Sequence, residues 1–354
     1  MILPTTALAS LILLTLTLLC WGSWSNSQKV LLKVRFELFY YDFALGLTAC
    51  VLLCAFTLGS LNSQELTVSD NMLIAGYHKL AFAVGAGVLA NLAFLLLVAA
   101  TSLSGMAVSF PLSFGIGLVV MSITNFAGSP QLNNGALLFS GIFFLLVAIV
   151  TNVIAYRSHL ATLKEATKYG PVMDPRTDRL VRPPIAARGI LLGVFSGLLM
   201  GFFFPLIESS RGGDNGVGPY GLAALIGLGM FFSTLLYVPF FMNFPVNGKP
   251  LQAEDYFKST RKQHLWGVLG GFVWAMGLVA VLVAAAAPPA AQPSPAISFG
   301  LVHGAPLVAA LWGLLTWHEA KDSSQGVKLL LVGTLVLYLA GVTLISLSSI
   351  YATK

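Results

Sequence analysis

The feature that most constrains this chain is a series of long apolar runs. Each run is about 20 residues long and carries almost no charge. Such a run can cross a hydrocarbon layer of roughly 30 Å. Lipid offers the backbone no hydrogen-bond partners, and apolar runs without alternation favour helices over barrel strands. The ten predicted spans cover about residues 4–24, 40–60, 77–100, 104–125, 135–156, 188–208, 219–242, 264–287, 296–317 and 327–348.

The composition agrees with an integral membrane protein. Hydrophobic residues make up 57% of the chain and charged residues only 9%, whereas soluble proteins carry roughly 25% charged residues. The first run lacks a basic leader and a small-residue cleavage site, so we expect a retained helix. The cysteines at 20, 50 and 54 lie in apolar spans without metal-ligand spacing. We interpret them as small buried hydrophobes and predict no metal site.

One segment of the chain occurs twice. Residues 107–120 read AVSFPLSFGIGLVV and residues 296–309 read AISFGLVHGAPLVA, and seven of these 14 positions are identical. The two copies lie about half a chain apart, which indicates two related halves. In membrane proteins such halves are typical of transporters that bind their substrate between them.

The basic residues predict the topology. If successive loops alternate between the two sides, sixteen of the 19 Lys and Arg residues fall on one side. The positive-inside rule makes that side cytoplasmic, which places both termini outside. Five spans per half is an odd number, so the second half crosses the membrane in the opposite sense. The predicted fold class is therefore all-α, with ten transmembrane helices in two inverted five-helix repeats, at 1–156 and 188–354, joined by a cytoplasmic linker at 157–187.

Several function classes are disfavoured. The chain has no G-x-x-x-x-G-K-[ST] motif, which argues against ATP-driven pumping. No catalytic triad, paired carboxylate or metal-ligand pattern stands out, so we predict neither an enzyme nor a cofactor. The surplus of basic residues follows from topology and contact with anionic lipid, so no nucleic-acid partner is expected.

Three motifs carry a family resemblance. CWGSWSNSQK at 20–29 ends the first span, RFELFYYDFALG at 35–46 opens the second, and the ninth and tenth spans contain HGAPLVAALWGLLTWHEAKDSSQG from 303 onward. Together these motifs resemble the drug/metabolite transporter superfamily, and within it the branch of ureide permeases, glucose/ribose porters and rhamnose–proton symporters. The resemblance covers nearly the whole chain. It implies ten helices in two inverted repeats around a central cavity that opens alternately to either side.

The chain also departs from parts of that superfamily. Plant ureide permeases often carry a nucleotide-binding-like signature in the central loop, and this chain has none. Small multidrug exporters carry a glutamate in the first helix, whereas residues 1–20 of this chain contain no ionisable side chain. This difference argues against drug–proton exchange by their mechanism.

Aromatic and amide side chains are candidates for a polar-solute site. Trp274 and Asn91 lie near the middle of the eighth and third spans, where we favour a cavity-facing position over helix packing. Trp21, Trp24 and Asn26 end the first span, either as binding or gating residues or as an interfacial belt with a helix stop. Two further candidates for cavity aromatics, with core packing as the alternative, are Trp312 and Tyr237.

Ionisable groups in the spans are candidates for coupling or gating. His303 lies in the ninth span and can carry a proton near neutral pH, although a neutral packing histidine is the slightly favoured alternative. Asp42 lies near the start of the second span, in an interface cluster where it can act as a gate. Glu319 follows the ninth span as an anchor or inner gate, and Glu208 ends the sixth span at the outer interface.

These observations predict a secondary active transporter. The substrate would be a small polar metabolite, a sugar or a ureide- or nucleobase-like compound, taken up with H⁺ or Na⁺ by alternating access. An exporter of metabolites or drugs on the same fold is the first alternative, and a non-transporting membrane sensor or scaffold is the second. We expect a bacterial inner-membrane protein in contact with lipids, and a homodimer is compatible with the sequence.

Overall fold

The structure is a computed structural model, and it is helical throughout its spans. The residues that it describes are 1–31, 34–61, 67–168, 173–174, 179–180, 186–213 and 215–352. Much of the predicted linker at 157–187 therefore lies outside the described residues, as do Lys33 and Asp214.

The described residues of the first half form seven α-helices and one short 3₁₀ turn. They are α1 (Ala7–Ser23), α2 (Asn26–Val30), α3 (Phe36–Phe56), α4 (Val68–Ile74), α5 (Tyr77–Ser104), α6 (Met106–Gly128), η1 (Pro130–Leu132) and α7 (Gly135–Lys168). A small hairpin follows, in which two strands of two residues each, β1 (Met173–Asp174) and β2 (Arg179–Leu180), pair antiparallel.

The second half holds the remaining helices. They are α8 (Ala186–Gly201), α9 (Phe203–Arg211), α10 (Pro219–Asn243), α11 (Ala253–Phe257), α12 (Arg261–Ala285), η2 (Pro289–Ala291), α13 (Pro295–His303), α14 (Ala305–Leu311), the π-helical turn η3 (Trp312–Thr316) and α15 (Gln325–Ser348).

Within the described residues, ten helices or helix pairs are long and apolar enough to span a membrane, which confirms the predicted number of spans. The boundary of the fifth span differs, because α7 continues past residue 156 to Lys168. Hydropathy predicts where a helix leaves the lipid, whereas the helix itself can continue into water. The residues after 156 include Leu, Ala, Lys and Glu, which favour helix in water as well.

Among the described residues, breaks interrupt the sixth and ninth spans. The sixth divides at Phe202 into α8 and α9, and the ninth divides at Gly304 into α13 and α14 before ending in η3. Pro306 removes a backbone donor just after the second break. Pro111, in contrast, lies inside the continuous helix α6.

Small residues let helices of the two halves approach closely. A Cβ on Gly197 of α8 would lie 2.4 Å from the carbonyl oxygen of Ser113 on α6. A Cβ on Gly271 of α12 would lie 1.9 Å from the carbonyl oxygen of Phe43 on α3. Only glycine fits at such backbone-to-backbone contacts. Gly193, Gly197 and Gly201 recur every four residues on one face of α8, and this face packs on α6.

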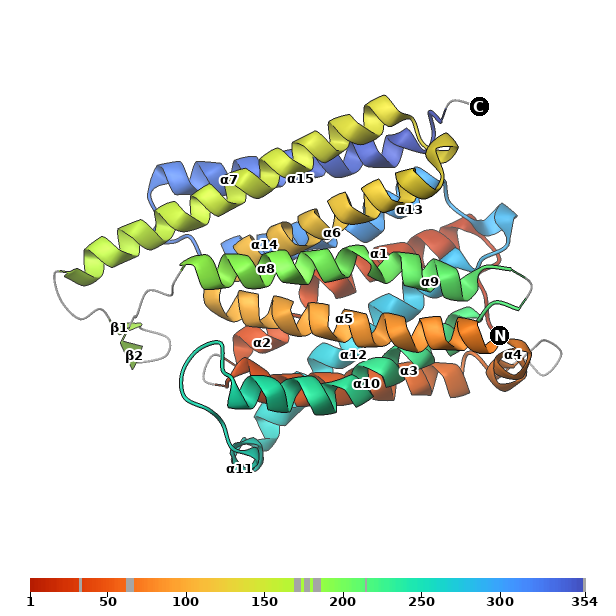
Figure 1. The fold of residues 1–354 in the computed structure, drawn as a ribbon, viewed down its shortest axis with the longest axis horizontal. Helices are drawn as coiled ribbons and strands as arrows, with labels where there is room; N and C mark the ends of the chain where they lie inside the picture. The colour runs from red at the N-terminus through yellow and green to blue at the C-terminus, as the bar shows by residue number, and fades with distance from the viewer. Residues whose placement is uncertain are drawn as a thin grey trace.

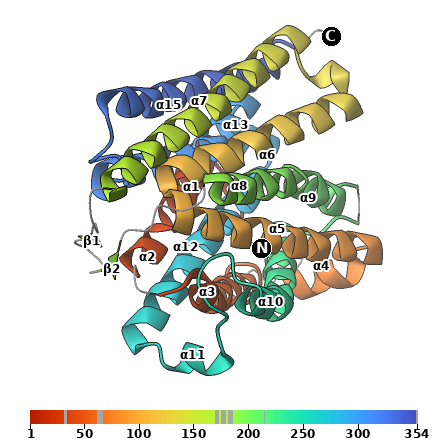
Figure 2. The ribbon, with the colours of Figure 1, turned by 60° about the vertical axis from the view of Figure 1, so that its left-hand side comes forward.

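The helices run roughly along one axis, and the two ends of the bundle differ (Figure 1). Both termini and α4 lie at one end, which we call the terminal end. The β1–β2 hairpin, α2 and α11 lie at the other, which we call the linker end. Figure 2 shows α7 and α15 side by side at one edge and α3, α10 and α12 at the opposite edge, with α1, α5, α6 and α8 between them.

Candidate functional site

An aromatic core lies where the central helices meet. We define it as Trp21, Trp24, Phe43, Phe94 and Trp274, all of which are buried. The rings of Trp21 and Trp274 stack with centroids 6.1 Å apart, and Phe94 meets Trp274 edge-on at 4.9 Å. Trp24 lies 5.0 Å from Phe43. Residues of the first and eighth spans, which sequence analysis proposed separately, are therefore brought together.

The aromatic core contains hydrogen-bond donors without partners. The indole Nε1 of Trp21 donates to the carbonyl oxygen of Trp274 at 3.1 Å. The Nε1 atoms of Trp24 and Trp274 are buried, and neither has a partner among the described residues. The hydroxyl of Ser113, on α6, is in the same state. A buried donor without a partner costs about 1–3 kcal/mol, so such groups call for an explanation.

Two cavities lie near this core. A small central pocket of about 30 Å³ is lined by Trp21, Phe94, Phe204 and His303, among others. A larger cavity of about 380 Å³ opens at the terminal end between α1, α9, α12 and α13. Phe204 and His303 line both cavities. Binding sites for metabolites usually reach about 300 Å³ or more, so of these two cavities only the one at the terminal end has that size.

His303 lies at the boundary between these cavities. Its ring is 5.5 Å from the ring of Phe204 and 4.3 Å from that of Phe299. It ends α13, and Tyr338 of α15 donates to its carbonyl oxygen at 3.5 Å. These aromatic contacts favour a neutral packing histidine that lines the outer path, which is the alternative interpretation of this residue.

At the linker end, two of the three sequence motifs face each other, the one at 20–29 and the one that begins at 303. Trp312 donates through Nε1 to the hydroxyl of Ser23 at 2.9 Å, and Trp317 donates to Oδ1 of Asn26 at 2.6 Å. Lys29 forms an ion pair with Glu319 at 2.5 Å. We call these six residues the inner clasp. They join α1 and α2 of the first half to η3 and the loop after it in the second half.

Glu319 is the central group of the inner clasp. Its two carboxylate oxygens accept from the backbone N–H groups of Met106 and Ala107, at 2.9 and 2.8 Å. These N–H groups open α6, so the carboxylate also meets the positive end of the helix dipole. Gly105 precedes them with φ +80, and a Cβ there would lie 2.6 Å from the Glu319 carboxylate. Only glycine meets both requirements.

The backbone around Glu319 is irregular. The π-helical turn η3 precedes it, and His318 adopts a φ of 51, which is rare for a residue other than glycine. The backbone N–H of Glu319 bonds to the carbonyl oxygen of Gly313 at 3.0 Å. Local irregularity of this kind is typical of functional positions.

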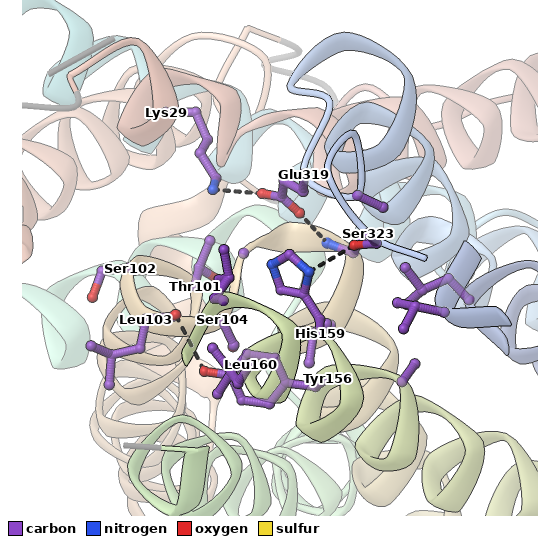
Figure 3. Close-up of a pocket in the computed structure, with 18 residues that line it drawn as sticks. Lys29, Thr101, Ser102, Leu103, Ser104, Tyr156, His159, Leu160, Glu319 and Ser323 are labelled. Carbon is purple, nitrogen blue, oxygen red and sulfur yellow. Dashed lines mark hydrogen bonds and ion pairs between the residues drawn. The ribbon is translucent and has the colours of Figure 1, made fainter. Parts of the chain in front are cut away.

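A pocket of about 250 Å³ lies beside the inner clasp (Figure 3). Lys29 and Glu319 form one side of this pocket, and His159 and Tyr156 of α7 project from another. The hydroxyl of Ser323 lies 2.7 Å from Nδ1 of His159. The pocket therefore combines a charged pair, an imidazole and hydroxyl groups at the linker end.

Asn91 does not line the central pocket or the terminal-end cavity. It is fully buried between α5 and α10, where its Nδ2 donates to the hydroxyl of Ser233 at 2.8 Å. Thr234 donates to its Oδ1 at 3.2 Å, and Tyr40 donates to its backbone oxygen at 3.0 Å. These contacts favour helix packing over the cavity-facing position that we expected.

We therefore predict that Asn91→Ala lowers the free energy of unfolding by about 1–2 kcal/mol, the usual range for hydrogen bonds between helices in a membrane. The partners on α10 would lose their bonds to the amide. Thermal unfolding in detergent measures this change. The control is Asn125→Ala, an exposed position at the end of α6. Equal stability of the Asn91 variant and the wild-type protein would contradict the packing role.

Asp42 lies in a second polar cluster near the linker end. Its Oδ1 accepts from the Tyr256 hydroxyl at 2.6 Å, and its Oδ2 lies 2.9 Å from Nδ1 of His264. The three residues come from α3, α11 and α12. Burial, and then the hydrogen bond to Asp42, raise the pKa of the Tyr256 phenol, so it remains a protonated donor.

The other candidates are placed away from the aromatic core. Tyr237 lines an open apolar hollow between α5 and α10. Glu208 is largely exposed at the terminal end, where it pairs with Arg211 at 3.1 Å and lines the outer cavity. Trp312 is 38% exposed and belongs to the inner clasp.

Sequence reasoning did not select His264, Tyr256, Lys29 or His159 as site residues. His264 lies one turn into the eighth span, and an ionisable residue at the boundary of a span could have marked it as a candidate site residue. Lys29 belongs to a motif already noted, but it was counted only for topology. His159 lies beyond the predicted end of the fifth span, in the part of α7 that hydropathy missed.

Comparison with known proteins gives three relatives of nearly full length. Ureide permease 4 of Arabidopsis thaliana is 23% identical, over 94% of this chain and 95% of its own length. Ureide permease 2 is 22% identical over the same shares, and ureide permease 1 is 19% identical over 88% of each chain. No family model matches the chain. No solved structure matches it.

These relatives are permeases, and their similarity runs through both halves of the chain. The same chain has ten helices of membrane length in its described part. It is therefore an integral membrane protein that transports small metabolites, and it is not an enzyme.

Proposed function

We propose that this chain is a secondary active transporter that takes up a ureide- or nucleobase-like compound by alternating access. One observation carries the proposal. The aromatic core presents two buried indole N–H groups that have no partner in the described part of the chain, beside rings that can stack on a planar solute. A ureide or nucleobase has a flat ring with carbonyl acceptors and fits such a site.

The relatives support the same substrate class, since all three are named ureide permeases. A sugar remains the second candidate for this chain. Export on the same fold is the alternative direction. The similarity to permeases weighs against a sensor or scaffold.

The two halves, 1–156 and 188–354, are proposed to be inverted repeats on either side of the linker at 157–187. The packing supports this. Exchanging each span with its counterpart turns the contact of α3 with α12 into that of α10 with α5. The same exchange converts the pair α6 and α8 into the pair formed by α1 with α13 and α14, and both of these contacts are present in the structure. Such pairing is expected when two similar halves pack about a pseudo-two-fold axis.

The linker end is proposed to be cytoplasmic, because most basic residues lie in its loops. Both termini would then be outside, in a bacterial inner membrane. The larger cavity opens at the terminal end, and the inner clasp joins the halves at the linker end. We therefore assign this conformation to the outward-facing side of the cycle, with the clasp as the inner gate.

A thermal-shift screen of the purified protein tests the proposal. The solutes are ureides, nucleobases, sugars and hydrophobic cations, each at two pH values and with or without sodium. A solute that binds the folded protein at about 100 times its Kd adds about 2.7 kcal/mol of stability. We expect stabilisation by a ureide or nucleobase, followed by its uptake into proteoliposomes. Stabilisation by hydrophobic cations alone would favour the exporter instead.

A further inference from the structure

Asp42 and His264 form a partly buried carboxylate–imidazole pair that lies outside the aromatic core. The side chain of Asp42 is 7% exposed and that of His264 is 28% exposed. Nδ1 of His264 lies 3.0 and 2.9 Å from the two carboxylate oxygens. One imidazole nitrogen thus contacts both carboxylate oxygens, and His264 lies in the first turn of α12, which begins near the linker end.

We propose that this pair is the proton-binding site that couples transport to pH at the linker end. The inference rests on the proposed function, and it names the coupling ion as H⁺. An imidazole in contact with a carboxylate can accept a proton and pass it on, and an ionisable pair inside a span is costly unless it has a role. Tyr256 holds the carboxylate in place with a hydrogen bond of 2.6 Å.

The geometry connects this site to the aromatic core. Phe43 follows Asp42 directly, and its ring lies 5.0 Å from Trp24 and 6.4 Å from Trp274. Trp274 is on the same helix as His264. The backbones of α3 and α12 approach closely along this seam, since a Cβ on Gly271 would lie 1.9 Å from the carbonyl oxygen of Phe43, and one on Gly267 would lie 2.4 Å from the Cβ of Asp42. A shift between these helices therefore changes the Asp42–His264 distance and the Phe43–Trp274 contact together.

Other charged groups surround the pair, and most are already paired. Arg35 pairs with Glu37, and Lys258 pairs with Asp255 at 2.9 Å. Further titratable or charged residues lie on the helices around this pair: Tyr40, Tyr41, Cys50 and Cys54 on α3, Glu254 on α11, Arg261 and Lys262 on α12, Tyr220 and Tyr237 on α10, Cys20 on α1, Lys29 on α2, and Tyr77, His78 and Lys79 at the far end of α5. His264 is the imidazole that contacts the carboxylate.

The competing position for a coupling proton is His303. Its ring contacts are aromatic, from Phe204 and Phe299, and no carboxylate is among its recorded partners in the described chain. A proton on His303 would therefore lack the counter-charge that Asp42 gives His264. Replacing each histidine in turn with glutamine distinguishes the two candidate positions for the coupling proton.

Proteoliposomes filled at different internal pH test the site, with external pH held constant. Raising internal pH from about 6 to about 8 should speed wild-type uptake at least about threefold, because it favours release of the proton inside. Asp42→Asn and His264→Gln should respond less than about half as strongly, since neither keeps the pair. His303→Gln should keep the wild-type response. His78→Gln, at the far end of α5, is the matched control.

A wild-type-like response in both Asp42→Asn and His264→Gln would overturn the proposal, as would its loss in His303→Gln alone. The pH dependence of the thermal midpoint is a second reading that needs no flux. It should be flatter in Asp42→Asn and His264→Gln than in the wild type and in His78→Gln. A flatter pH dependence in these two variants, together with no uptake of any solute by the wild type, would support the proton site and contradict the proposed transport function. An unchanged dependence in both variants would remove the site.

Discussion

Glu319→Gln is expected to lower net uptake at least about tenfold by weakening the inner clasp. The substitution removes the charge that pairs with Lys29 and places an amide N–H₂ where the α6 N–H groups need an acceptor. Charge-assisted hydrogen bonds contribute roughly 1.5–3 kcal/mol each, and the helix dipole adds up to about 1 kcal/mol. A loss of about 2–3 kcal/mol changes a conformational equilibrium by roughly 30- to 150-fold.

The variant should open the linker end, and this opening can be measured directly. Val108 is 7% exposed and lines the pocket beside the clasp. In a background without Cys20, Cys50 and Cys54, a cysteine replacing Val108 reports access to a thiol reagent. Labelling should be faster with Glu319→Gln. The control is Glu165→Gln, at an exposed carboxylate of α7. Wild-type labelling and uptake in Glu319→Gln would show that the clasp is only a structural anchor.

Lys29→Met is the smaller perturbation of the same contact. Glu319 keeps both backbone N–H groups in this variant, so only the ion pair is lost. A partly exposed ion pair contributes about 1 kcal/mol or less. The order of effects, Glu319→Gln above Lys29→Met, distinguishes loss of the helix cap from loss of the charge pair.

The number of spans followed from hydropathy, because lipid forces each apolar run to become a helix. Three details of the fold did not follow. The helix α7 extends beyond the lipid to Lys168. The sixth span is interrupted at Phe202, between α8 and α9, and a π-helical turn begins at Trp312. These features depend on contacts and backbone hydrogen bonds rather than on apolar length.

The site was predictable only in part for a related reason. Trp274 and Trp21 could be chosen as candidate site residues from the sequence, because a large aromatic residue deep in a span or at its end is recognised from that span alone. The environment of Asn91 depends on Ser233, 142 residues away, and that of Asp42 depends on His264, 222 residues away. Local sequence does not indicate which helices will be neighbours, so packing and cavity positions could not be told apart.

Trp274→Phe is expected to weaken substrate binding at least about tenfold, since the lost N–H would serve the substrate and a hydrogen bond is worth about 1.5 kcal/mol. The stability of the free protein should hardly change. A smaller ring loses buried area, worth about 1–2 kcal/mol, but the substitution also removes a buried donor without a partner. These two contributions have similar size and opposite sign.

Trp21→Phe is the matched control for stability. It loses the same volume, but its N–H already bonds to the carbonyl oxygen of Trp274 at 3.1 Å. Removing that donor leaves a buried carbonyl without this bond, so the free energy of unfolding should fall by about 2–3 kcal/mol. Thermal unfolding without ligand compares the two variants, and a ligand titration of the Trp274 variant gives its affinity.

The comparison isolates the role of an unpaired donor, because both substitutions replace an indole with a phenyl ring in the same core. If Trp274→Phe destabilises the free protein as much as Trp21→Phe and binds substrate like the wild type, the Trp274 N–H has no ligand role. If it keeps its stability and loses affinity, the unpartnered indole is reserved for the solute. Trp24→Phe should then behave in the same way, since its Nε1 also lacks a partner in the described chain.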